Sequence, residues 1–387
     1  MTLSEPSLPP LDRADDGTRS GSLWLTGFSV AMLLALALQL SVLLATAGAG
    51  GHDWIHGDWL INLAGGPIRR GALGSTILAL SDVTGLSPLD IVMAMQVALA
   101  SAFFLGIAFL LFAQTSSGMS LAVMSPGIFA LVWTLAPMAA GRKELFGLVA
   151  LLLLALPGGR SGRMILSALL LALGGIGHEV NLLLFPAWVA FLFLFPRPVS
   201  VAGQRVIIVA LGGVVAWAAA YALIHARLAS SDAICAALTD RGLDGSRLCS
   251  GAIAWLSEPA NGMASVGEAL AKVRNPGLLP IYWLCCALPL LRLWLVSKPP
   301  RLALMVLAVG IGPIFLLYPV ALDWGRWVAI QTTVAGLILL GLGARGRVQP
   351  VRPISLPERI LWLANTLAWT PLHVIGVAFG GLFALAI

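Results

Sequence analysis

Charged side chains are scarce in this sequence, and those outside its short basic loops gather in four clusters. The clusters contain guanidinium groups, carboxylates and an imidazole, which are groups that bind anions and transfer protons. A charge at membrane depth costs about 2.5–3.5 kcal/mol, so such groups usually pair or face a cavity. The clusters are Asp53 and Asp58 followed by Arg69 and Arg70, then Arg142-Lys143-Glu144, then His178-Glu179, and finally Asp323 with Arg326.

Guanidinium groups beside carboxylates predict a specific kind of chemistry. Arginine binds phosphate oxygens through a planar pair of donors, and several cations suit a phosphate or pyrophosphate better than a neutral ligand. A carboxylate beside them can act as general base toward a hydroxyl, while the cations stabilise a departing phosphate. The predicted catalytic residues are Asp53, Asp58, Glu179 and His178, and the predicted substrate-binding residues are Arg69, Arg70, Arg142, Lys143, Glu144, Asp323 and Arg326.

Each cluster also has a simpler interpretation. The first pair of arginines could anchor an interfacial helix to lipid headgroups, and the second cluster could snorkel at a helix end. The third could be a polar pair satisfied between helices, and the charges of the fourth, spaced i, i+3, could pair only with each other. The first cluster could also bind a divalent cation through His52, Asp53, His56 and Asp58. Alternatively, this stretch could be a Trp-rich segment that lies at the membrane interface.

The surrounding sequence is that of a membrane protein. It is 59% hydrophobic and 10% charged, whereas a soluble domain carries about 25% charged residues. Apolar runs of about 17 to 25 residues can each cross the hydrocarbon as a helix, and they lack the alternation of a barrel. We therefore expect an all-α, polytopic transmembrane bundle of about 11 spans, at 23–47, 90–113, 120–140, 145–158, 164–177, 180–196, 206–226, 277–297, 302–320, 327–344 and 361–386.

Basic residues in the short loops predict the orientation. With the N-terminus inside and the C-terminus outside, nearly every short inside loop is basic, as the positive-inside rule requires. Residues 1–22 are expected to be a disordered cytoplasmic tail, and residues 23–387 a single transmembrane domain. Two long outer loops, 48–89 and 227–276, should carry interfacial helices. The short pair 145–158 and 164–177 could be two tilted spans or one re-entrant hairpin.

The second outer loop is flanked by two cysteines. Cys235 and Cys249 could form a disulfide there if that loop lies in an oxidising compartment.

Together, these features resemble the bacterial polytopic glycosyltransferases of the GT-C type and the Wzy-like polysaccharide polymerases. The resemblance rests on the span pattern, on the acidic first outer loop, on Gly-Gly-Pro-Ile-Arg-Arg-Gly at 65–71 and on the later outer-face motifs Arg-Lys-Glu, His-Glu and Asp-Trp-Gly-Arg-Trp. It implies a base or metal ligand at Asp53 or Asp58 and arginines that grip a lipid phosphate. The lack of histidine in 227–276 departs from many O-antigen ligases.

The function that the resemblance implies is cell-envelope polysaccharide biosynthesis in the bacterial inner membrane. A sugar or repeat unit would pass from a polyprenyl-phosphate-linked donor to a glycan or lipid-linked acceptor on the periplasmic face. Membrane lipids are the other expected partners, and nucleic acid is not expected, because the net charge of +6 lies in short loops.

Two other classes of function compete with this one. A transporter or flippase for a lipid-linked or anionic substrate would need polar residues along a path to the inner face. The inner halves of the helices are almost wholly apolar, with Gln331, Thr332 and Thr333 among the few exceptions. A non-catalytic scaffold would leave the four clusters apart.

Overall fold

A computed structural model of the chain describes residues 18–128, 141–158, 161–195, 199–228, 230–258, 262–272, 279–352 and 354–369. Within these ranges every regular element is a helix. The α-helices are α1 (Thr18–Gly48), α2 (Gly71–Thr84), α3 (Pro88–Phe112), α5 (Leu145–Ala155), α6 (Ser161–Gly177), α7 (Phe185–Leu194), α8 (Val201–Ile224), α9 (Asp232–Thr239), α10 (Gly245–Leu248), α11 (Gly262–Lys272), α12 (Leu279–Ser297), α13 (Arg301–Ile311), α14 (Trp324–Gly343) and α15 (Leu356–Ala368). Short 3-10 helices are η1 (Gly57–Leu60), η2 (Ser117–Met124), η4 (Glu179–Leu184), η5 (Ala254–Leu256) and η7 (Gly312–Leu317).

Apolar helices dominate the chain, as expected for a membrane protein. Five are long and apolar enough to cross a membrane, and they lie in α1, α3, α8, α12 and α14. Four shorter apolar helical stretches are Leu145–Ala155, Ser161–Gly177, Glu179–Leu194 and Arg301–Leu317. Each of these nine stretches coincides with one of the expected spans.

Two of the expected spans are described only in part. In the segment 120–140, the described portion begins with the 3-10 helix η2, and residues 129–140 lie outside the described ranges. The last expected span, 361–386, overlaps α15 up to Ala368, and residues 370–386 also lie outside them.

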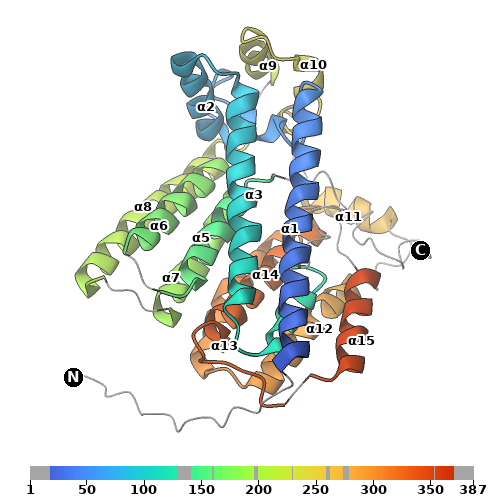
Figure 1. Ribbon diagram of the computed structural model, residues 1–387. Helices are drawn as coiled ribbons and strands as arrows, with labels where there is room; N and C mark the ends of the chain where they lie inside the picture. Colours follow the sequence, from blue (N-terminus) through green and yellow to red (C-terminus); the bar gives the residue numbers. More distant parts are fainter. Residues whose placement is uncertain are drawn as a thin grey trace.

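The core of the bundle is formed by α5 and α14. Every residue of α14 from Gly325 to Gly343 is buried, as is almost every residue of α5. By contrast, α8 buries only Leu211 and Ala218. A helix that is apolar and buried on all sides belongs to a core, whereas an apolar helix with exposed sides must face lipid. Along the flank shown in Figure 1, α1 and α3 lie side by side.

One end of the bundle carries the two long loops, and they pack on each other. In Figure 1, α2, α9 and α10 lie together at the top. We call the described residues of 226–258 the cap. The expected disulfide between Cys235 and Cys249 is formed within the cap. Arg247 donates to the carbonyl of Ala49 at 2.6 Å, which fixes the cap to the end of α1.

The opposite end of the bundle gathers the short loops. Arg345 donates to the carbonyls of Ala155 and Leu156, at the end of α5, and Arg347 donates to the carbonyl of Leu194, at the end of α7. The loops that the positive-inside rule placed on one side therefore lie at one end.

Helix α5 determines the depth of the charges that precede it. It has 11 residues, so it is about 16 Å long, roughly half the hydrocarbon thickness of a bilayer. In Figure 1 it lies below the level of α2. The Arg-Lys-Glu sequence just before Leu145 is therefore buried inside the bundle instead of standing at the tip of a full span.

Candidate functional site

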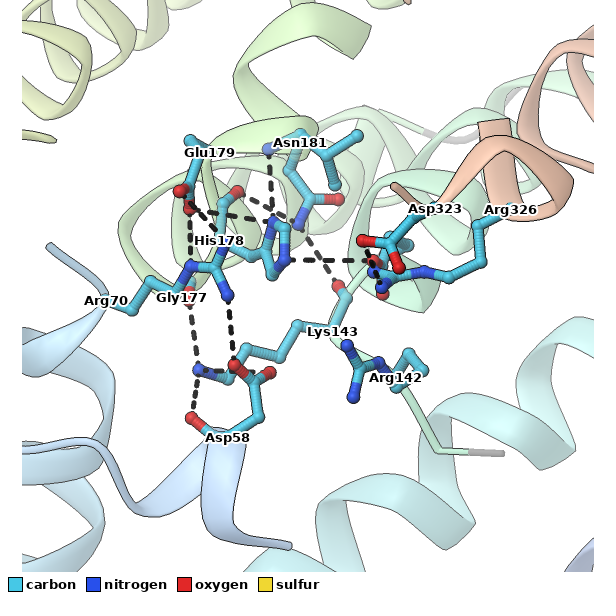
Figure 2. Close-up of polar contacts among 12 residues, drawn as sticks. Asp58, Arg70, Arg142, Lys143, Gly177, His178, Glu179, Asn181, Asp323 and Arg326 are labelled. Carbon is cyan, nitrogen blue, oxygen red and sulfur yellow. Dashed lines mark hydrogen bonds and ion pairs between the residues drawn. The ribbon is translucent and has the colours of Figure 1, made fainter. Parts of the chain in front are cut away.

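The four predicted clusters converge in space. Figure 2 shows side chains from η1, from the start of α2, from the start of α5, from the turn between α6 and η4, and from the start of α14 pointing toward one another. A scaffold with unrelated loop charges does not fit this arrangement. We call the assembly the polar cluster, and its members are Asp58, Arg69, Arg70, Arg142, Lys143, Glu144, His178, Glu179, Asp323 and Arg326.

Glu179 forms ion pairs with two consecutive arginines. Arg70 makes a bidentate pair with it, Nε to Oε2 at 2.7 Å and Nη2 to Oε1 at 2.9 Å, and Nη1 of Arg69 lies 2.8 Å from Oε1. Arg70 also reaches Oδ1 of Asp58 at 3.3 Å. Arg70 is the N-cap of α2 and adopts a left-handed conformation with φ 65°. Such a conformation is costly for a residue with a Cβ, and here the surrounding ion pairs hold it.

Lys143 and Asp58 form the most deeply buried pair. The Nζ of Lys143 donates to the carbonyls of Asp58 at 2.6 Å and Gly177 at 3.1 Å and lies 3.6 Å from Oδ2 of Asp58. Burial lowers the pKa of Lys143 to about 8, although Asp58 opposes that shift. Burial acts to raise the pKa of Asp58, but the charges of Lys143, Arg142 and Arg70 overcome it and hold that pKa below its usual range. Both groups are therefore charged at pH 7.

A second set of contacts surrounds Glu144. It pairs with Arg326, whose Nη1 also lies 3.1 Å from Oδ2 of Asp323. The i, i+3 pair is therefore present, but it belongs to a larger network. Nε2 of His178 lies 3.8 Å from Oε1 of Glu144. The Nδ1 of His178 accepts a hydrogen bond from the backbone N–H of Val180 at 3.2 Å, which places the proton of the neutral ring on Nε2.

His178 stays neutral over the physiological range. Burial, with a further contribution from the charge of Arg70, lowers the pKa of His178 to about 3. It can therefore orient a hydroxyl but adds no charge to the polar cluster.

Arg142 is bound differently from the other cations. Its side chain is buried, and its Nη1 donates to the carbonyl of Trp54 at 2.8 Å. Its Nε has no hydrogen-bond partner, and no carboxylate among the described residues forms an ion pair with it. The polar cluster holds five cations and four carboxylates. Because His178 is neutral, one positive charge is left without a counter-ion.

Asn181 positions the start of α5 and was not predicted as a site residue. Its Nδ2 donates to the carbonyls of Lys143 and Gly174, both at 3.1 Å, and its Oδ1 accepts from the N–H of Gly147 at 3.0 Å. A Cβ at Gly147 would lie 2.5 Å from that Oδ1, so a glycine is needed there. The only sequence signal was an amide directly after His-Glu-Val in an apolar stretch.

A small pocket lies beside the arginine pair. It is lined by Arg69, Arg70, Ala72, Gly175, Ile176, Glu179, Trp217, Ala218, Tyr221 and Ala222. The residues from α8 were not predicted, because nothing in an apolar span distinguishes its pocket-facing side. Trp217 and Tyr221 stack with their ring centroids 5.4 Å apart.

Asp53 does not join the polar cluster. Its carboxylate accepts from its neighbour's N–H and from Oγ of Ser250 in the cap at 3.1 Å. The structure also gives no support to a cation site formed by His52, Asp53, His56 and Asp58. Nδ1 of His56 is occupied by the N–H of His52, and the described residues contain no group of three or more His, Cys, Asp or Glu able to hold a metal ion.

No protein-family model matches the chain, and no curated protein or solved structure matches it either. The resemblance to the GT-C and Wzy-like enzymes therefore stays a prediction.

Proposed function

We propose that this protein is a membrane glycosyltransferase or polysaccharide polymerase that transfers a sugar or repeat unit from a polyprenyl-phosphate-linked donor. The observation that carries the proposal is the excess positive charge of the polar cluster as a whole, which holds five cations and four carboxylates. A buried charge without a counter-ion is costly, so the site favours an anionic ligand. The adjoining pocket is partly aromatic and aliphatic, which suits a ligand with one charged and one apolar part.

Among the three carboxylates predicted as base, we choose Asp58 because one of its oxygens is free to accept a proton. Both oxygens of Glu179 accept from arginines, and Asp53 bonds to the cap. Oδ2 of Asp58 accepts no hydrogen bond among the described residues. In the proposed step, Asp58 takes the proton of the acceptor hydroxyl while that oxygen bonds to the anomeric carbon.

The bond from the anomeric carbon to the phosphate oxygen breaks in the same step. The phosphate leaves with the electron pair, and the cations stabilise its developing charge. His178, with its proton on Nε2, orients a hydroxyl.

The topology that we propose places the cap outside and the short basic loops inside. Disulfides form and persist in oxidising compartments, and the Cys235–Cys249 bond lies in the cap. The basic loops lie at the opposite end, as the positive-inside rule would have it. Eleven spans, a cytoplasmic N-terminus, a periplasmic C-terminus and a bacterial inner membrane are consistent with both observations.

The polar groups deeper in the bundle give little support to the alternative function, a transporter. The side chain of Gln331 bonds to Trp283, Tyr318 and the carbonyl of Ile311. The hydroxyl of Thr332 donates to its own helix. Gln331 and Thr332 are therefore engaged with the surrounding protein, whereas the buried hydroxyl of Thr333 has no hydrogen-bond partner among the described residues.

The sharpest test changes Arg142, because it forms no ion pair with a carboxylate among the described residues. Purified protein would be given radiolabelled polyprenyl-linked sugars, with Arg142→Gln compared with Arg247→Gln. Arg247 is an exposed arginine that also donates to a backbone carbonyl. We expect Arg142→Gln to lower donor turnover about 100-fold, as when one preorganised donor is removed from a transition state. The control should keep wild-type turnover.

Two outcomes would contradict the proposal. One is full turnover by Arg142→Gln. The other is no turnover of any donor by the wild type, together with substrate-dependent flux in liposomes, which would favour a transporter.

A further inference from the structure

The arginine side of the polar cluster opens into the pocket. Arg69 and Arg70 share the single carboxylate of Glu179 there, so this face retains positive charge even though Arg70 also reaches Asp58. The Nε of Arg69 is buried and has no hydrogen-bond partner. Ala72, in the first turn of α2, also lines the pocket, and the side chain of the N-cap residue does not cap this helix end. The N–H of Gly71 donates to the carbonyl of Ile68, and the N–H groups that follow it in that turn add to the attraction for an anion.

The opposite wall of the pocket is a face of α8. Trp217, Ala218, Tyr221 and Ala222 repeat at the spacing that one side of a helix presents. Of the five candidate spans, α8 has the smallest buried share, 11% of its most apolar window. Trp217 is 54% exposed. The rim of the pocket on the α8 side therefore faces the hydrocarbon of the bilayer, where an exposed apolar helix must lie.

The cap packs against the loop that precedes α2. The N–H of Arg69 donates to the carbonyl of His225 at 2.8 Å, which ties the loop before α2 to the end of α8. A Cβ at Gly65 would lie 3.6 Å from side-chain carbons of both Leu228 and Ile234. The wall of the pocket that is exposed in part is the one on α8, where Trp217 lies.

We propose that a lipid-borne phosphate enters the site sideways from the bilayer, between α6 and α8. Its phosphate binds Arg69 and the first turn of α2, and its chain lies along Trp217, Tyr221 and Ala222. This inference rests on the proposed function and adds to it the entry route and the binding position of the lipid phosphate. A phosphate dissolved in water has the same headgroup chemistry but no chain to fill the α8 wall.

Binding in nanodiscs of neutral phosphatidylcholine tests the route directly. The probes are a polyprenyl monophosphate in the bilayer and inorganic phosphate in the buffer, and binding is read by native mass spectrometry and by thermal unfolding. Arg69→Gln removes the proposed binding position of the phosphate, and Ala222→Trp fills the pocket. Arg241→Gln, at an exposed arginine paired with Asp82, and Ala220→Trp, on an exposed side of α8, are the matched controls.

We expect Arg69→Gln to raise the Kd for polyprenyl monophosphate about tenfold or more, since a hydrogen bond to a charged group is lost. Ala222→Trp should abolish binding, and both controls should bind like the wild type. Arg69→Lys keeps the charge and should bind the lipid more tightly than Arg69→Gln. This variant shows whether Arg69→Gln loses binding through the lost charge or through unfolding.

The outcomes separate the route from the reaction. Wild-type binding by both Arg69→Gln and Ala222→Trp would overturn the route, even in a protein that turns over donors. Inorganic phosphate that competes as well as the lipid would overturn sideways entry in favour of entry from water. If the variants lose the lipid while no sugar donor is turned over, the route stands and the glycosyl-transfer proposal fails.

Discussion

Arginines at the two ends of this bundle differ in their partners. At the end with the short loops, Arg345 donates to the carbonyls of Ala155 and Leu156, at the C-terminus of α5, and its guanidinium lies over the ring of Phe195. In the polar cluster, Arg70 pairs with carboxylates, and Arg142 has no carboxylate partner among the described residues. Arginines that cap helix ends complete the fold. We propose that the excess positive charge of the polar cluster serves instead to bind an anionic ligand.

The largest effect on stability should come from the buried pair of the polar cluster. Lys143→Met leaves the carboxylate of Asp58 without its lysine and leaves two carbonyls without their donor. We expect the free energy of unfolding to fall by about 3–5 kcal/mol, the cost of leaving one partner of a buried pair. Denaturant unfolding in detergent would measure it. A change below about 1 kcal/mol would mean that the pair is not buried as described.

The same measurement at the other end should give a smaller effect. Arg345→Gln loses part of the capping of α5, and we expect a decrease of about 1–2 kcal/mol in the free energy of unfolding. Affinity for polyprenyl monophosphate should not change, in contrast to Arg69→Gln, which should lose affinity. The comparison between the two ends fails if Arg345→Gln weakens lipid binding as much as Arg69→Gln does.

The pH dependence of binding should be the mildest effect. With a pKa of about 8, Lys143 is charged below pH 8 and neutral above it. Affinity for an anionic ligand should therefore be constant from pH 6 to about 7.5 and fall roughly threefold to tenfold as pH rises through 8, because one cation is lost. His178, with a pKa of about 3, is neutral throughout this range.

Lys143→Arg provides the control for this titration, since arginine stays charged. Its affinity should be flat to pH 9. An unchanged fall in Lys143→Arg would assign the titration to another group.

The sequence by itself determined the class of fold and the inventory of the site. Long apolar runs must form helices in lipid, because each backbone group has to bond within its own segment, and this rule is local. Nine of the expected spans therefore match apolar helical stretches. The described start of the segment 120–140 differs. Its Ser and Gly residues are poor α-helix formers, and residues Ser117–Met124 form a 3-10 helix.

The tertiary structure decided which of the predicted residues meet. Asp53 and Asp58 are the same type of residue and close in sequence, yet one bonds to the cap and the other lies inside the polar cluster. Arg70 and Glu179 are 109 residues apart, and no local pattern records such a pairing. The pocket wall on α8 and the missing counter-ion of Arg142 depend on how helices pack. Hydropathy is a property of each segment, whereas partners are a property of the whole bundle.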